Sequence, residues 1–257
     1  MSSSLGSDVL SGLKQGALFA GAVLVLTLPP PGLATSRAAR SPAVARSLPV
    51  AHLTTFHGAD FGAQPVSDDV RFVADWASDS GDSRGLPFVI LDKRDARVFV
   101  FAPTGALIDS SPVLLGAAPG DDPAEGIGTR PMALVRPEEK TTPAGRFVGT
   151  PGKNASGEEV FWVDYADAVS MHRVRPVDPK ERRLERLASP DPSQRRISYG
   201  CINVPVAFFE SVVWPLLSPS RAVVYVLPET RDVREVFAQA YTVATKPPAR
   251  PTAVANM

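Results

Sequence analysis

Cysteine and histidine are scarce in this chain of 257 residues. Its single cysteine, Cys201, excludes an internal disulfide and any zinc site built on several cysteines. Three histidines, His52, His57 and His172, leave little material for a metal centre of any kind. The 27 basic side chains are balanced by 27 acidic ones, so the basic field that nucleic-acid binding needs is missing. With 44% hydrophobic residues, the composition is that of a globular protein with a buried core.

A long hydrophobic run is also missing, but a short one lies near the N-terminus. Lys14 precedes an almost wholly apolar segment at 17–28, and prolines and small residues follow it. This order is typical of a secretory signal peptide, and the run is shorter than the roughly 20 apolar residues of a membrane span. We therefore expect residues 1–39 to be a signal peptide cleaved between Ala34 and Ala39. An uncleaved N-terminal membrane anchor is the alternative, and in both cases the protein is exported.

Residues 66–241 are predicted to form one domain of mainly β (α+β) class. Residues 40–65, rich in Ala, Pro, Ser and Gly, predict a linker that contains His52 and His57, and 242–257 predict a disordered tail. Between them, 66–241 begin with a helix capped by Ser67. Short apolar segments separated by turn residues predict strands at 88–91, 97–101, 106–108, 113–116, 147–148, 161–163 and 222–227, with a further helix at 232–241. Many short strands and few helices favour a mixed-sheet β-sandwich.

The segment around Cys201 carries the clearest chemical signal. Cys201 follows Gly200 and precedes an apolar pattern that predicts a helix running from Pro205 to Leu216. A thiol at a helix N-terminus has a lowered pKa, and Gly200 allows a tight turn whose backbone N–H groups converge as an oxyanion hole. His172 is the candidate general base. The residue types alone leave two interpretations open, because a lone cysteine is often a small buried hydrophobe and a lone histidine is often structural.

Three motifs resemble the L,D-transpeptidase (YkuD-type) family of cell-wall enzymes. Residues 198–203, Ser-Tyr-Gly-Cys-Ile-Asn, are similar to that family's Ser/Thr-His-Gly-Cys-aliphatic-Arg/Asn element, and His172 matches its upstream histidine. Residues 140–147, with Thr142-Pro143-Ala144-Gly145-Arg146-Phe147, resemble its Thr-Pro-x-Gly-x-Phe segment. The likeness covers about 86–228. It implies a β-sandwich of the L,D-transpeptidase type with a helix following the catalytic cysteine.

The resemblance also implies roles for these residues. Cys201 would be the nucleophile, His172 the general base, and the backbone of Tyr199, Gly200 and Cys201 the oxyanion hole, with the Arg173 carbonyl orienting His172. The implied reaction is acyl transfer on peptidoglycan stem peptides, through a thioester, to form 3→3 cross-links. It needs no cofactor or metal, and it implies a location in the periplasm or cell envelope of a bacterium. The oligomeric state is left open by the sequence, and a monomer is the default expectation.

The sequence departs from the family pattern at two points. Tyr199 replaces the family's second histidine, from which we expect an altered substrate preference. The 29 positions from His172 to Cys201 exceed the family's usual gap, and the highly charged residues 176–196 are predicted to be an inserted flap. Its basic side chains would meet substrate carboxylates, although a solvated loop is the plainer interpretation; these side chains are Arg182, Arg183, Arg195 and Arg196.

Three further predictions concern the surroundings of the cysteine. We expect Ser198, Tyr199, Asn203 and Arg196 to contact the substrate. The Ser198 hydroxyl is also predicted to support the loop, and Asn203 to cap the helix.

Two other functions remain open from the sequence. Water instead of an amine could resolve the thioester, which would make the protein an L,D-carboxypeptidase, an endopeptidase or an amidase. The substitution at Tyr199 is also compatible with a non-catalytic homologue that binds peptidoglycan.

Overall fold

The computed structural model describes residues 58–243. The predicted signal peptide or anchor, the linker as far as His57, and the tail from 244 onward lie outside the described residues. Within 58–243, no helix has the length and apolar character needed to cross a membrane.

Eight strands form one mixed sheet, in the order β3-β2-β1-β10-β5-β6-β7-β9. Most neighbours run antiparallel, whereas β1 with β10 and β7 with β9 are parallel. Two short strands, β4 (Leu115–Gly116) and β8 (Arg196–Ser198), form a separate parallel pair. The strands of the large sheet are β1 (Phe88–Asp92), β2 (Arg97–Phe101), β3 (Leu107–Pro112), β5 (Gly145–Lys153), β6 (Glu159–Asp164), β7 (Val169–Arg173), β9 (Ile202–Val204) and β10 (Ala222–Val226). The predicted mainly β, mixed-sheet class is confirmed.

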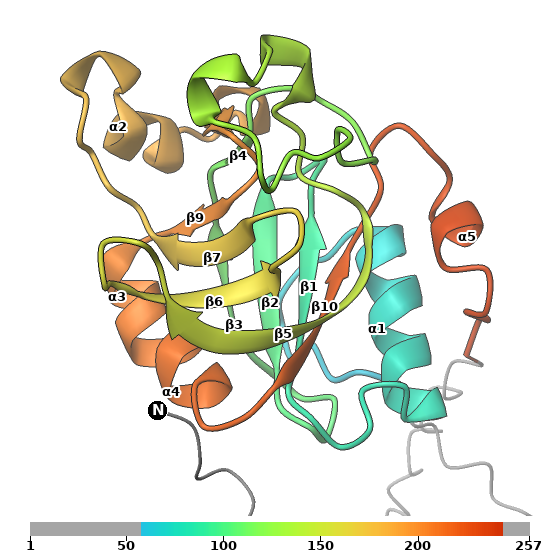
Figure 1. Cartoon of the computed structure of the whole chain (residues 1–257). Helices are drawn as coiled ribbons and strands as arrows, with labels where there is room; N and C mark the ends of the chain where they lie inside the picture. Colours follow the sequence, from blue (N-terminus) through green and yellow to red (C-terminus); the bar gives the residue numbers. More distant parts are fainter. Residues whose placement is uncertain (1–57, 244–257) are drawn as a thin grey trace, which may run out of the picture. The chain divides into compact units, whose positions relative to one another are not determined.

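The two halves of the large sheet face each other across the main core. Strands β5, β6 and β7 cross in front of β1, β2 and β10 in Figure 1. Side chains from both halves meet between them, for example Val89 and Val100 on one side and Phe161 and Met171 on the other. Each fully buried side chain of this size contributes about 1.5–3 kcal/mol through the hydrophobic effect.

Strand β1 is buried on both faces because a helix covers its other side. Val89 and Leu91 point into the main core, whereas Phe88 and Ile90 join a second core beneath α1 (Asp68–Ser80). As predicted, α1 is capped by Ser67, whose hydroxyl accepts a hydrogen bond from the Val70 N–H at 3.3 Å.

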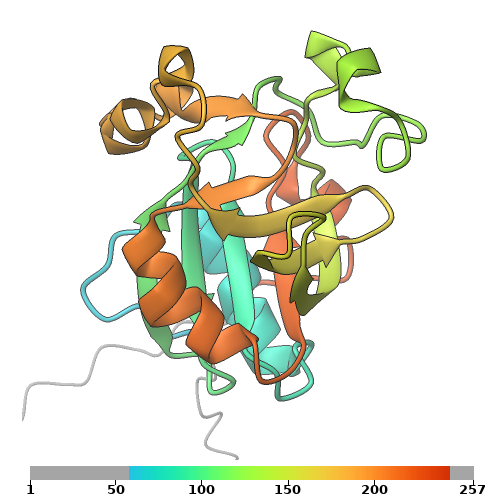
Figure 2. The same cartoon turned by 60° about the vertical axis from the view of Figure 1, so that its left-hand side comes forward.

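A continuous helix follows β9 and packs its apolar side on the main core (Figure 2). It comprises α3 (Val206–Phe208), a π-helical segment η5 (Phe209–Val213) and α4 (Trp214–Leu217). This agrees with the apolar pattern predicted to run from Pro205 to Leu216. The predicted helix at 232–241 is wrong in its extent: α5 covers only Val233–Val236, because Phe237 leaves the helical conformation and is buried in the second core.

Candidate active site

Parallel pairing of β7 with β9 brings Cys201 and His172 into one region. His172 lies in β7 opposite Asn203 of β9, and Cys201 directly precedes β9. Side chains alternate along a strand, so Ser170 and His172 leave the same face of β7. Two residues that are 29 positions apart in the chain therefore become close neighbours.

Cys201 is not at a helix N-terminus, and this sequence prediction is wrong. Strand β9 separates Cys201 from α3, whose N-cap is Pro205. The apolar pattern after the cysteine begins with Ile202 and Val204, which alternate as strand residues and are buried in the main core. Asn203 lies between them in β9 and does not cap the helix, contrary to expectation.

The Cys201 thiol is half-buried and held by β7 and the turn before it. Its Sγ lies 3.6 Å from Ser170 Oγ and 3.5 Å from the Ala168 carbonyl oxygen. Burial is the largest influence on the pKa of the thiol and raises it. The hydrogen bond and charge of His172, together with the hydrogen bonds of Ser170, outweigh burial, and the pKa of Cys201 falls below its ordinary value. Sequence reasoning missed Ser170, although its two-residue spacing from His172 on a strand was the available signal.

The imidazole of His172 is engaged at both ring nitrogens. Nδ1 lies 2.8 Å from the Arg173 carbonyl oxygen, which is the contact that the family resemblance implies. Nε2 lies 3.3 Å from Nδ2 of Asn203. Asn203 is almost wholly buried, with 1% of its surface exposed, so it supports the site from inside the cleft.

The loop that carries Cys201 is fixed by hydroxyl groups. Ser198 Oγ donates to the Cys201 carbonyl at 2.6 Å and accepts from the Gly200 N–H at 3.1 Å. Thr142 Oγ1 donates to the Gly200 carbonyl at 2.9 Å. The Gly200 N–H is thus bound to Ser198 in this structure, and the oxyanion-hole role of the Tyr199 and Gly200 backbone stays a prediction.

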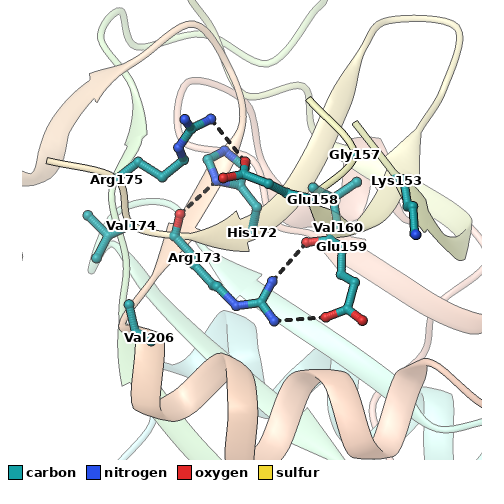
Figure 3. Close-up of a pocket in the computed structure, with 10 residues that line it drawn as sticks. All are labelled: Lys153, Gly157, Glu158, Glu159, Val160, His172, Arg173, Val174, Arg175 and Val206. Atoms are coloured by element: carbon teal, nitrogen blue, oxygen red, sulfur yellow. Dashed lines mark hydrogen bonds and ion pairs between the residues drawn. The ribbon is translucent and has the colours of Figure 1, made fainter. Parts of the chain in front are cut away.

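Two cavities meet at His172. One, of about 410 Å³, contains Cys201 and is bordered by Met132, Val177, Arg183 and Tyr199. The other, of about 490 Å³, lies along β6 and β7 and is lined by charged groups, among them Lys153, Glu158, Glu159 and Arg173 (Figure 3). His172 and Arg175 line both cavities, so the imidazole is accessible from either one.

The segment 176–196 borders the Cys201 cavity through a few residues. It contains a short 3-10 turn, η3 (Pro179–Glu181), the helix α2 (Arg183–Ala188) and a second 3-10 turn, η4 (Pro192–Arg195). Val177, Glu181 and Arg183 from this segment line the cavity.

Of the four arginines expected to meet the substrate, Arg183 alone lines the Cys201 cavity. Arg182 pairs with Glu185 at the surface. The Arg195 guanidinium binds backbone carbonyls, and Arg196 binds Glu229 and the Lys93 carbonyl. The guanidinium of Arg196 is therefore committed to a structural contact.

Tyr199 stands at the mouth of the Cys201 cavity with 37% of its surface exposed. The Lys140 ammonium lies 4.0 Å above the centre of its ring, a cation–π contact. The motif at 140–147 therefore contacts the cysteine loop through both Lys140 and Thr142.

Comparisons with known proteins give likenesses to solved structures. No protein-family model matches the chain, and no curated protein matches it. The crystal structure of the Enterococcus faecium L,D-transpeptidase C442S mutant is 17% identical, with a TM-score of 0.31, and the match covers 55% of this chain and 49% of that one. The NMR structure of the catalytic domain from the E. faecium L,D-transpeptidase is 16% identical over 55% of this chain and 95% of that domain, with a TM-score of 0.31.

A third similar structure is the Ldtfm-avibactam carbamoyl enzyme. It is 14% identical, with a TM-score of 0.34, over 56% of this chain and 49% of that one. The chain thus spans about half the length of the longer structures that it matches.

Proposed function

We propose that the protein is a cysteine-dependent acyltransferase that acts on peptidoglycan stem peptides, in the manner of an L,D-transpeptidase. The observation that carries the proposal is the arrangement of Cys201, His172 and the Arg173 carbonyl. A thiol of lowered pKa stands beside an imidazole whose far nitrogen is bound to a carbonyl oxygen, and both border an open cavity. A nucleophile, a base and a group that orients the base are the parts that covalent acyl transfer needs. The peptidoglycan substrate rests on the motifs at 140–147 and 198–203.

The proposed reaction has two balanced halves. His172 Nε2 takes the thiol proton, and the Cys201 sulfur attacks the carbonyl of the third stem residue, a diamino acid. The bond to the terminal D-Ala breaks, its nitrogen takes the proton from His172, and a thioester remains on Cys201. An amine from a neighbouring stem then attacks the thioester, its proton passes through His172 to the departing sulfur, and a 3→3 cross-link forms.

Intact-mass spectrometry of the full-length chain tests this proposal. The protein is incubated with a disaccharide-tetrapeptide or, separately, with a carbapenem, which is an acylating probe. We expect a covalent adduct on the wild type, none on Cys201→Ala, and slower labelling of His172→Gln, because that variant lacks the base. Cross-linked product from the tetrapeptide would indicate transfer to an amine, and tripeptide alone would indicate hydrolysis.

The control variant is Ser211→Ala, which removes an exposed hydroxyl bound to a carbonyl of its own helix. It should label like the wild type. If neither compound labels Cys201 while iodoacetamide does so rapidly, the thiol is reactive but the proposed substrate is wrong. If iodoacetamide also fails, the enzymatic function is refuted and peptidoglycan binding takes its place.

A further inference from the structure

A buried amide connects the segment 176–196 to the proposed catalytic pair. Arg183 Nη1 donates to Oδ1 of Asn203 at 2.6 Å. The Nε atom of the same guanidinium donates to the carboxylate of Glu181 at 2.5 Å. A guanidinium only donates hydrogen bonds, so the atom of Asn203 that faces Arg183 must be the oxygen. The NH₂ group of Asn203 consequently faces His172 Nε2 and the Cys201 carbonyl, each at 3.3 Å.

This orientation has a consequence for the imidazole of His172. An amide NH₂ group also only donates, so the Nε2 atom that it meets has to accept. Nε2 then carries the lone pair, and the ring proton lies on Nδ1, which donates to the Arg173 carbonyl. Protonating Nε2 would place two donors face to face. The oriented amide therefore fits an Nε2 atom that carries its lone pair.

Other charged groups surround the ring, and they form pairs of opposite sign. In the cavity of Figure 3, Arg175 pairs with Glu158 and Arg173 pairs with Glu159, while Lys153 lines the rim. On the Cys201 side, Glu181 pairs with Arg183, and Arg175 also lines the cavity. The Cys201 and Tyr199 side chains lie there too, with the Lys140 ammonium over the Tyr199 ring. Within each of these pairs the opposite charges largely cancel. The Asn203 amide, in contrast, makes a directional contact with Nε2.

We propose that Arg183 is a positioning residue for the Cys201–His172 pair: it holds the Asn203 amide as a donor to Nε2 and so limits formation of the thiolate–imidazolium pair. The inference rests on the proposed role of Cys201 as nucleophile. It gives the inserted segment a function in setting the reactivity of the thiol, separate from any contact with substrate.

Two substitutions of Arg183 separate the effect of its hydrogen-bond donor from the effect of its positive charge. Arg183→Gln and Arg183→Met both remove the positive charge, but glutamine retains an NH₂ donor for Asn203 Oδ1 and methionine does not. In Arg183→Met the amide keeps only the 3.3 Å contact of its NH₂ group with the Cys201 carbonyl. When it gives up that contact and turns, its buried oxygen accepts from a protonated Nε2. The rate of Cys201 alkylation by iodoacetamide is measured from pH 5 to 10 in the full-length chain.

For each variant, the rate of Cys201 alkylation at pH 6 is divided by the rate at pH 9. We expect this ratio to be about tenfold higher in Arg183→Met than in Arg183→Gln, because a factor of about ten corresponds to one hydrogen bond of ordinary strength. Arg183→Lys, which keeps both donor and charge, should restore the wild-type profile. The matched controls are Arg182→Gln and Arg182→Met, whose neighbouring guanidinium pairs with Glu185 away from the cavity; these two should coincide with the wild type. Superimposable profiles for Arg183→Met and Arg183→Gln would overturn the proposal.

A measurement on the wild type keeps the proposal testable even if Arg183→Met does not fold. In protein labelled with ¹⁵N-histidine, the signals of His172 are identified by their absence in His172→Gln. We expect Nδ1 protonated and Nε2 unprotonated near neutral pH, and a protonated Nε2 would refute the inference. Failure of the peptidoglycan substrate in the mass-spectrometry experiment leaves both of these readouts unaffected, so the two proposals fail separately.

Discussion

The hydroxyl of Thr142 connects three segments of the chain beneath the proposed active site. Its Oγ1 accepts a hydrogen bond from the Gly116 N–H at 3.0 Å and donates one to the Gly200 carbonyl at 2.9 Å. Thr142 is fully buried, so water has no access to these groups. Replacing it with valine keeps the shape of the side chain and removes both hydrogen bonds.

The expected magnitude follows from the two groups that lose their partner. A buried donor or acceptor left without a hydrogen bond costs about 1–3 kcal/mol, so the loss of two partners in Thr142→Val should lower the free energy of unfolding by about 2–6 kcal/mol. The Gly200 peptide also loses the contact that fixes its orientation next to Cys201. We therefore expect the rate of Cys201 alkylation to change in the folded variant, whereas a purely structural effect elsewhere would leave that rate unchanged.

The assay is urea unfolding followed by circular dichroism, with iodoacetamide labelling of the folded protein in parallel. Thr141→Val is the matched control, because the neighbouring hydroxyl binds the Asp122 carbonyl at an exposed position and should cost less than about 1 kcal/mol. Thr142→Ser, which keeps the hydroxyl, should recover much of the stability. If Thr142→Val unfolds at the same urea concentration as Thr141→Val, the reasoning about these buried hydrogen bonds is refuted.

Two other predictions concern the loop and the buried charges. Gly200 has a φ of 131°, and a Cβ there would lie 2.6 Å from the Thr141 carbonyl oxygen. Gly200→Ala should therefore abolish the acylation of Cys201, which intact-mass spectrometry would follow. A Gly200→Ala variant that is stable and still acylated would contradict this. Asp121 is buried, which raises its pKa, but Lys93 and Thr230 donate to it and hold the pKa of this carboxyl well below its ordinary value. Since the pKa is lower in the folded state, the associated stability is present above pH 4 and is lost as the pH falls below it. Asp121→Asn should cost about 3–5 kcal/mol at pH 7 and less in acid, measured by urea unfolding at both pH values; an equal loss at both would exclude the ionised carboxylate as the cause.

The amount that the sequence could predict depended on how far apart the interacting residues lie. The capped helix at Ser67 and the hairpin of β1 and β2 follow from local patterns, because capping and alternation act between near neighbours. Strands β7 and β9 were missed, since each is short and is specified by its pairing with the other. A run such as Ile202–Val204 fits the start of an apolar helix as well as a strand when its partner is unknown.

The same limit applies to the candidate site. Cys201, His172 and the Arg173 carbonyl came from the family resemblance. In the structure His172 contacts the Arg173 carbonyl, and Cys201 lines the same cavity as His172. Arg196 was expected at the substrate because of its charge, but charge alone does not reveal a partner such as Glu229, which lies 33 positions away in the chain. Ser170 contributes to the surroundings of the thiol only through the geometry of β7.

The source of thiol activation is therefore different from the one that the sequence indicated. Without a helix dipole at Cys201, the lowering of its pKa depends on two residues of β7, the side chain of His172 and both the backbone and the side chain of Ser170. The contacts of Cys201 with His172 and Ser170 require the cysteine loop to be held in place against β7. The Thr142 hydroxyl holds this loop through its hydrogen bond to the Gly200 carbonyl. Lys93 in turn donates to the Thr142 carbonyl at 2.8 Å and to Asp121 at 2.7 Å, with its ammonium fully buried. A buried ion pair of this kind adds little net stability compared with apolar side chains of similar size. Its physical effect here is to fix the direction of the Thr142 backbone, and through the Thr142 hydroxyl the position of Gly200 next to the reactive sulfur.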